Sequence, residues 1–328
     1  MVGAAHTWRT AARLAGAPLL LAAVLWQAGP AAVVGALRRA DAVWLVAGLA
    51  SSLAFNALSA LRWRHLLAWL GHELSAQWAL AVTFRALALG SLLPGATVGG
   101  DLLRVWHLRR HGCTGAAAGM SVVLDRLSGL WMLWALAAAG LAAGAAAPEL
   151  QPFQRALGLP GGAPLAPLGL GALLLVLTLP VALLAAWRAS GRGQGLATLL
   201  RQPAPLRAYA WQATASLAAQ AFSVASFACA ARAFGIDLPM ELIAITAAPI
   251  FLMAALPLSF GGWGTRELAT VAAWSALGVA APQATSASLA FGGYALVQAA
   301  LGLMPVPRPA TQLDTARAQP GCVPTSTG

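Results

Sequence analysis

The chain has 328 residues, of which 59% are hydrophobic and only 9% are charged, and its mean hydropathy is +0.74. Soluble domains carry about 25% charged residues, so this composition excludes an ordinary soluble enzyme and indicates an all-α membrane protein with several spans. The net charge of +11 does not indicate nucleic-acid binding, because the arginines stand in short clusters between apolar runs, where they orient spans and meet anionic headgroups. The three cysteines have no metal-ligand spacing, and we expect neither a metal nor a cofactor.

Two membrane spans are predicted at the start of the chain. No charge occurs between Arg13 and Arg38, and a helix needs about 20 apolar residues to cross a bilayer, so this stretch can hold the first span. Residues 42–61 form the second span. It ends at Arg62-Trp63-Arg64, which we interpret as an interfacial anchor of aromatic and basic side chains.

The next segment is interrupted by proline and glycine. Residues 77–93 are predicted to enter the membrane as a half-helix that Pro94 ends. Gly99-Gly100 then form a turn, and residues 101–111 return to the same side. We expect a re-entrant hairpin here, because the charge-free part is too short to cross the bilayer.

Three further spans are predicted in the middle of the chain. Residues 115–147 contain one of them, with Asp125 and Arg126 near its start. A loop rich in proline and glycine follows, with a short interfacial helix around Arg155. The other two spans are residues 168–187 and 209–231.

A second interrupted segment lies near the end of the chain. Residues 241–256 are predicted to enter the membrane, a break begins at Pro257, and residues 265–277 form a helix too short to span. Residues 286–304 form the last span. We therefore expect about six full spans and two re-entrant hairpins in one domain of residues 1–305, followed by a disordered tail of residues 306–328.

The two hairpins suggest an inverted repeat. Most arginines fall on one side if both termini are cytoplasmic, as the positive-inside rule requires. The halves, about residues 14–147 and 165–304, then have opposite orientation. Inverted repeats with broken helices place the substrate near the middle of the membrane. We accordingly expect Asp101–Arg104 and Thr265–Glu267 to approach one another.

The interruptions favour an anionic ligand. A half-helix exposes its first N–H groups and a partial positive charge, which together suit a phosphate group. We expect Asp101 and Thr265 to act as N-caps, with Arg104 and Arg266 in the first turns.

Structural interpretations of the same residues remain open. Arg104 can instead belong to the cytoplasmic arginine cluster, and the glycine pairs can serve close helix packing. His107 and His111 lie four residues apart, but interfacial histidines explain them better than a metal half-site does. Asp125 and Arg126 are adjacent, so each needs a partner of its own.

Four motifs occur in one order along most of the chain: LRWRHLLAWLG (61–71), LLPGATVGGDLLRVWHLRRHG (92–112), SVVLDRLSGL (121–130) and LPLSFGGWGTRE (256–267). With them the sequence resembles the lysylphosphatidylglycerol synthase transmembrane-region family, also called flippase-like membrane proteins. The family often has Glu-Arg where this chain has Asp125-Arg126. The resemblance implies a protein of the bacterial inner membrane that translocates lipids.

The resemblance also implies a functional core. Its candidate residues are Gly99, Gly100, Asp101, Arg104, Arg126, Gly262, Arg266 and Glu267. Secondary candidates are Arg85, Asp125, Pro94 and Pro257.

These features together predict a flippase-like transporter without enzymatic activity. It would bind the phosphate-bearing headgroup of a phospholipid or a polyprenyl-phosphate-linked lipid. Two alternatives stay open: an enzyme acting on lipid-linked substrates, and a non-transporting membrane partner of a glycosyltransferase or another lipid-modifying enzyme. The enzyme has less support, because the first outer turn offers only Asp41 as an acidic residue.

Overall fold

The computed structural model describes residues 26, 29–92, 96–144, 150–156, 158, 160, 164–189, 205–255 and 262–303. The secondary structure of these residues is entirely helical, which confirms the predicted all-α class. Most of the first predicted span, Pro94, Pro257 and the tail of residues 306–328 lie outside the described residues.

The helices follow the predicted order along the chain. The first half forms α2 (Pro30–Arg38), α3 (Ala42–Trp69), α4 (Ala76–Leu92), α5 (Ala96–Arg110) and α6 (Gly115–Ala143). The connection and the second half form α7 (Leu150–Ala156), α8 (Leu165–Ala189), α10 (Pro205–Ala233), α11 (Met240–Ala255), α12 (Thr265–Ser275), α13 (Ala281–Ala299) and the 3-10 helix η2 (Ala300–Leu303). The short helix expected around Arg155 is α7.

Polar caps fix the starts of two long helices. The carboxylate of Asp41 accepts a hydrogen bond from the backbone N–H of Val43 at 2.8 Å, at the start of α3. The hydroxyl of Thr114 accepts one from the N–H of Ala117 at 3.3 Å, at the start of α6. Each cap satisfies an N–H group that the helix itself leaves without a partner.

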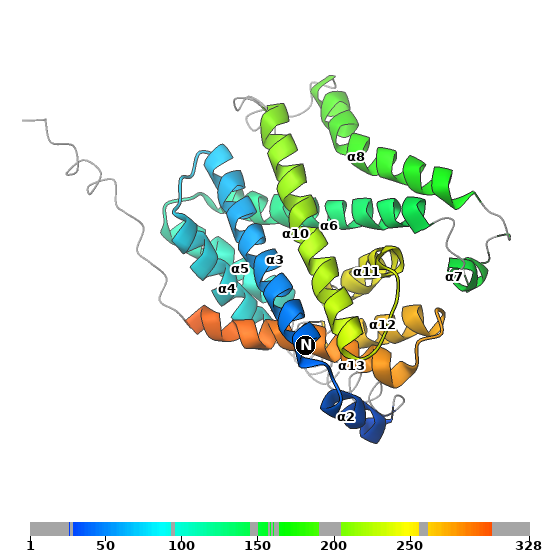
Figure 1. The fold of residues 1–328 in the computed structure, drawn as a ribbon. Coiled ribbons are helices and arrows are strands. Elements are labelled where there is room, and N and C mark those ends of the chain that lie inside the picture. Colours follow the sequence, from blue (N-terminus) through cyan, green and yellow to red (C-terminus); the bar gives the residue numbers. More distant parts are fainter. Residues whose placement is uncertain are drawn as a thin grey trace, which may run out of the picture.

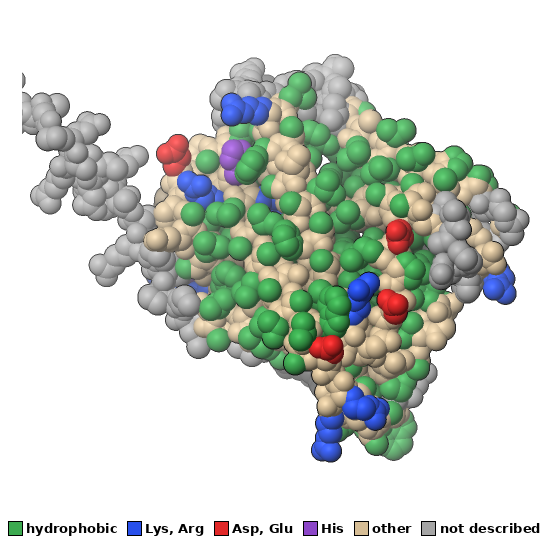
Figure 2. All heavy atoms as spheres, in the orientation of Figure 1, with side chains coloured by type: hydrophobic (Ala, Val, Ile, Leu, Met, Phe, Trp, Pro, Cys, Tyr) green, Lys and Arg blue, Asp and Glu red, His purple; other side chains and the backbone are tan. Residues whose placement is uncertain are grey.

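Within the described ranges, three helices are long and apolar enough to cross a membrane, namely α3, α6 and residues Leu206–Ala233 of α10. Shorter apolar stretches occur in α8 and α11. Figure 2 shows hydrophobic side chains along the middle of α3 and α10, with charged side chains toward the ends of this pair. This distribution is typical of helices whose middle meets lipid and whose ends meet headgroups.

α3 and α10 form an antiparallel pair at the centre of the molecule (Figure 1). At one end the N–H of Asp41 donates to the carbonyl oxygen of Ala233 at 2.9 Å. Toward the other end Arg62 Nη1 donates to the hydroxyl of Ser216 at 3.1 Å. Behind this pair, α6 and α13 cross it and pack on both of its helices.

The helices α3–α6 and α10–α13 have matching neighbours. α4 packs on α5 as α11 packs on α12, and α5 packs on α6 as α12 packs on α13. Across the two sets, α4 packs on α13 as α11 packs on α6, and α13 packs on α3 as α6 packs on α10. Exchanging the two sets of four helices therefore preserves these contacts.

Two apolar cores hold the helices together. The larger core surrounds Phe227, which contacts the rings of Phe251, Trp274 and Phe291 from α11, α12 and α13. The smaller core is built on Trp63 of α3, stacked on Trp78 of α4 with 5.9 Å between ring centroids. The polar cluster described next lies directly against this second core.

Candidate functional site

A buried ion pair joins α3 to α6. Arg62 Nε and Nη2 donate to Oδ1 of Asp125 at 3.0 and 2.8 Å, and Nη2 also donates to the backbone carbonyl of Asp125 at 3.1 Å. Both residues are almost fully buried, with exposed fractions of 4% and 3%. Arg62 lies seven residues, about 10 Å, before the end of α3 at Trp69. The sequence suggests that a span ends at Arg62 with an interfacial anchor. In the structure α3 continues to Trp69, and Arg62 is buried against Asp125 of α6 and Ser216 of α10.

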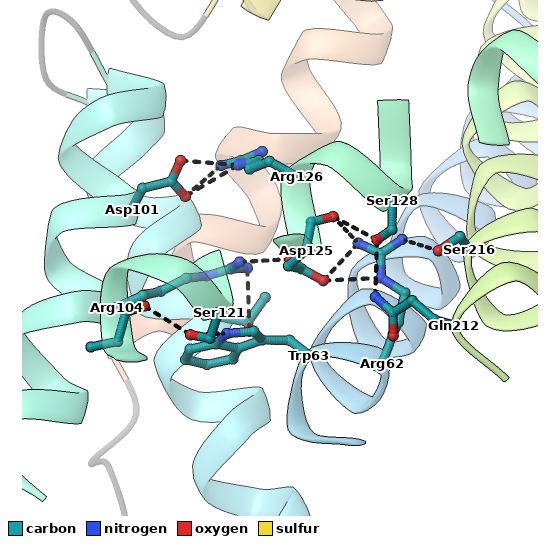
Figure 3. A network of polar contacts seen from close by, with 12 residues as sticks. Arg62, Trp63, Asp101, Arg104, Ser121, Asp125, Arg126, Ser128, Gln212 and Ser216 are labelled. Carbon is teal, nitrogen blue, oxygen red and sulfur yellow. Dashed lines mark hydrogen bonds and ion pairs between the residues drawn. The ribbon is translucent and has the colours of Figure 1, made fainter. Parts of the chain in front are cut away.

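Arg104 of α5 binds the other oxygen of the same carboxylate. Its Nη1 donates to Oδ2 of Asp125 at 3.1 Å, and its Nη2 donates to the hydroxyl of Thr83 at 3.5 Å, the long limit of a hydrogen bond. The guanidinium carbon lies 4.9 Å from the ring centroid of Trp63, a cation–π distance. The Nε of Arg104 is buried and has no hydrogen-bond partner in the described part of the chain. Asp125 thus lies between two guanidinium groups from different helices (Figure 3).

Arg126, the sequence neighbour of Asp125, pairs instead with Asp101 of α5. Arg126 Nη2 and Nε donate to the two carboxylate oxygens at 2.9 and 3.0 Å. This pair is accessible, with 51% of the Arg126 side chain and 24% of the Asp101 side chain exposed. The neighbouring side chains of Leu102 and Leu127 are also exposed. An exposed ion pair therefore sits on an apolar surface, beside the buried cluster (Figure 3).

A second buried network lies at the start of α12. Arg266 Nη2 donates to Oε1 of Glu267 at 2.6 Å, and the hydroxyl of Ser288 donates to the same oxygen at 3.0 Å. The other oxygen, Oε2, accepts a hydrogen bond from the N–H of Gly264 at 2.5 Å, which caps the helix. One arginine and one carboxylate balance each other here.

The two networks use separate sets of partners. Asp101 and Arg104 bind side chains of α4 and α6, whereas Arg266 and Glu267 bind Gly264 and α13. The expected approach of the two broken segments stays a prediction. The hydrogen bonds of the first network join α3, α4, α5, α6 and α10, and those of the second join the start of α12 to α13.

The predicted N-caps were wrong. α5 begins at Ala96, so Gly99, Gly100 and Asp101 are inside the helix rather than in a turn before it. At α12 the N-cap is Gly264 with φ +87°, and Thr265 is the first helical residue. The carboxylate that caps this helix comes from Glu267, three residues after the cap, as in a capping box.

The glycines of the motifs serve close packing and a turn. A Cβ on Gly100 would lie 2.7 Å from the carbonyl oxygen of Ala86, so this glycine lets α5 approach α4. A Cβ on Gly99 would meet no atom of the described residues within 4 Å. Gly262 has φ +83°, a conformation that other residues rarely adopt, just before α12.

The remaining candidates lie outside the two networks. Arg85 Nε donates to the carbonyl oxygen of Gly302 at 3.4 Å and so links α4 to η2. His111 Nδ1 contacts the carbonyl oxygen of His107 at 2.7 Å, within one turn of α5. Among the described residues, no group of three histidine, cysteine or acidic side chains could hold a metal ion.

Sequence reasoning missed Arg62, Thr83 and Ser216 as members of the cluster. A signal existed for Arg62 alone, because the motif LRWRHLLAWLG places an arginine seven residues before the helix ends. A charged residue that deep in an apolar helix needs a partner. Thr83 and Ser216 are ordinary polar residues of apolar helices and carry no such signal.

An all-helical fold with helices long enough to cross a membrane, and with arginine and aspartate paired between them, defines a helical membrane protein. The family model described as the lysylphosphatidylglycerol synthase TM region matches residues 11–302. The chain therefore belongs to this family, as its four motifs indicated. No curated protein matches the chain.

Proposed function

We propose that the protein is a lipid flippase-like transporter of the bacterial inner membrane. It moves a phospholipid or a polyprenyl-phosphate-linked lipid, and it holds the phosphate-bearing headgroup at the cluster of Arg62, Asp125 and Arg104. The observation that carries the proposal is that two guanidinium groups flank one buried carboxylate on α6, a helix long and apolar enough to cross a membrane. An arginine at the centre of a membrane helix costs about 2.5–3.5 kcal/mol on insertion scales, so buried arginines commonly mark a substrate pathway.

The exposed pair of Arg126 and Asp101 favours a lipid over a water-soluble substrate. Both residues are partly exposed, and the exposed Leu102 and Leu127 flank them. A lipid that stays in the bilayer can bring its headgroup to this pair from the side while its chains remain in contact with the leucines. Arg126 adjoins Asp125 in the sequence, and Asp101 lies one helical turn before Arg104, so the exposed pair leads directly to the buried cluster.

We further propose about six full spans, two re-entrant hairpins and an inverted repeat, with halves of about residues 14–147 and 165–304 and both termini in the cytoplasm. Two observations support this proposal: the matching neighbours of α3–α6 and α10–α13, and the antiparallel contact of α3 with α10. Accessibility labelling of single cysteines placed beside Gly99 and Gly262 tests it. Labelling of both positions from the cytoplasm alone would contradict the inverted arrangement.

The transport proposal is tested with purified protein in lipid vesicles that contain a fluorescent phosphatidylglycerol. A membrane-impermeant reductant bleaches the label in the outer leaflet, so translocation appears as a loss beyond half of the signal. We expect rapid loss with the wild type and at least tenfold slower loss with Arg104→Gln. Signal loss no faster than in protein-free vesicles would refute transport and favour the role of a non-transporting partner for a glycosyltransferase or another lipid-modifying enzyme.

A further inference from the structure

The cluster around Asp125 carries an unbalanced positive charge. It contains three guanidinium groups, on Arg62, Arg104 and Arg126, and two carboxylates, on Asp101 and Asp125. Among the residues that the structure describes, one positive charge of this cluster therefore has no carboxylate of its own. The network at the start of α12 differs in this respect, because Glu267 balances Arg266.

The unbalanced charge is located at Arg104, because the other two arginines are better satisfied. Arg62 donates four hydrogen bonds, to Asp125 and Ser216. Arg126 binds both carboxylate oxygens of Asp101. Arg104 has one ion pair at 3.1 Å, one hydrogen bond at 3.5 Å and the cation–π contact with Trp63. Its Nε has no hydrogen-bond partner among the described residues, although Arg104 is only 7% exposed. Burying a hydrogen-bond donor without a partner costs free energy, so the guanidinium group of Arg104 is available to bind an anion.

We propose that Arg104 binds one phosphate group carrying a single negative charge, and that Arg62 is the positioning residue that makes this possible. This inference rests on the proposed function and names the headgroup chemistry of the same site. When Arg104 turns toward a phosphate oxygen, Asp125 keeps its pairing with Arg62 and stays neutralised. The phosphate then replaces Asp125 as the anion of Arg104.

The charge balance selects the ligand. A phosphodiester contributes one negative charge and brings the cluster to neutrality. A phosphomonoester carries about −1.5 to −2 at neutral pH and would leave a buried negative charge. The site accordingly suits the phosphodiester of a glycerophospholipid or of a polyprenyl-phosphate-linked sugar. Free inorganic phosphate offers related chemistry from another source.

The inference is tested by binding in detergent, with dihexanoyl phosphatidylglycerol as the phosphodiester, dihexanoyl phosphatidic acid as the monoester, and inorganic phosphate as the free ion. We expect Arg104→Gln and Arg62→Gln each to weaken phosphatidylglycerol binding at least tenfold. Arg62→Lys, which restores a cation beside Asp125, is expected to bind within about threefold of the wild type. Arg110→Gln, which removes an exposed charge from the same helix, serves as the matched control and is also expected to stay within threefold.

Thermal unfolding in the absence of lipid serves as the control for correct folding of the variants. Arg104→Gln leaves Arg62 and Asp125 as a balanced pair, so it should unfold at or above the wild-type temperature. A lower unfolding temperature would give Arg104 a structural role and overturn the inference, as would unchanged phosphatidylglycerol binding by Arg104→Gln. Tenfold tighter binding of phosphatidic acid would overturn the selection for a single charge. Arg104-dependent binding of inorganic phosphate as tight as that of the lipid would support the phosphate site and assign it to the free ion.

The binding assay in detergent and the translocation assay in vesicles together separate this inference from the transport proposal. Arg104-dependent binding without translocation in vesicles would refute transport and leave the phosphate site intact. Translocation that proceeds equally well in Arg104→Gln, together with unchanged binding, would refute the phosphate site and leave transport intact.

Discussion

Asp125 and Arg126 are adjacent in the sequence, yet they bind different partners: Asp125 binds Arg62 of α3 and Arg104 of α5, and Arg126 binds Asp101, one turn before Arg104 on α5. Asp125 is buried between Arg62 and Arg104, whereas Arg126 is half exposed and pairs with Asp101. Successive residues of a helix point in different directions, so one Asp-Arg dipeptide supplies both a buried anchor and a surface pair. The two residues should therefore respond differently to substitution.

Removing the charge of Asp125 is expected to destabilise the fold strongly. Asp125→Asn leaves the buried guanidinium groups of Arg62 and Arg104 without a carboxylate, and breaking a buried pair in this way costs about 3–5 kcal/mol. The measurement is thermal or denaturant unfolding in detergent.

Asp101→Asn is the control, because it removes a carboxylate from the partly exposed pair on the same helices. The loss in the free energy of unfolding should be smaller for Asp101→Asn than for Asp125→Asn, since Arg126 can extend toward water or headgroups. Equal losses in the free energy of unfolding of the two variants would show that burial does not determine how much each ion pair stabilises the fold.

Most of the helix order could be predicted from the sequence, because apolar runs separated by arginine, proline and glycine mark helices clearly. The start of α5 could not. Gly99-Gly100 suggested a turn, but α5 already begins at Ala96 and both glycines are helical. A glycine inside a membrane helix and a glycine in a turn look identical in one sequence, and only the closeness of Ala86 shows which role Gly100 has.

The candidate site was predictable in its charges but not in its pairing. Asp101, Arg104 and Arg126 do meet at α5 and α6. The third cation, Arg62, comes from α3, and this contact depends on how α3 packs against α6. Long-range packing of this kind leaves no periodic signal in the chain.

The two glycines at the start of α5 should differ in their tolerance of alanine. Gly100→Ala places a Cβ 2.7 Å from the backbone oxygen of Ala86, which cannot move without shifting α4. Overpacking of this kind costs about 1–3 kcal/mol. In Gly99→Ala the new Cβ meets no atom of the described chain within 4 Å. This variant should be neutral or slightly stabilising, because alanine favours a helix. Unfolding temperatures of the two variants compare them directly, and a stable Gly100→Ala protein would contradict the close contact of α4 and α5.

A second matched pair of glycines tests the packing around Arg266. In Gly292→Ala the new Cβ would overlap with the guanidinium of Arg266 and would displace it from Glu267. In Gly293→Ala the Cβ meets no atom within 4 Å. We expect a lower unfolding temperature for Gly292→Ala and an unchanged one for Gly293→Ala. Similar unfolding temperatures for both would mean that Arg266 can leave its position without cost.

The coupling between buried Arg266 and Glu267 can be tested by removing the two charges one at a time and together. Glu267→Gln keeps the shape of the side chain and an oxygen that can accept from the N–H of Gly264, but it leaves Arg266 buried and uncompensated. We expect a loss of about 3–5 kcal/mol in the free energy of unfolding, as for other broken buried pairs. The double variant Arg266→Gln/Glu267→Gln removes both charges and should be more stable than Glu267→Gln alone, because no unpaired charge remains. Denaturant unfolding of the wild type, both single variants and the double variant measures this coupling. If the double variant loses the sum of the two single losses, the pair is not coupled, and the stability of α12 comes from the cap at Gly264 instead.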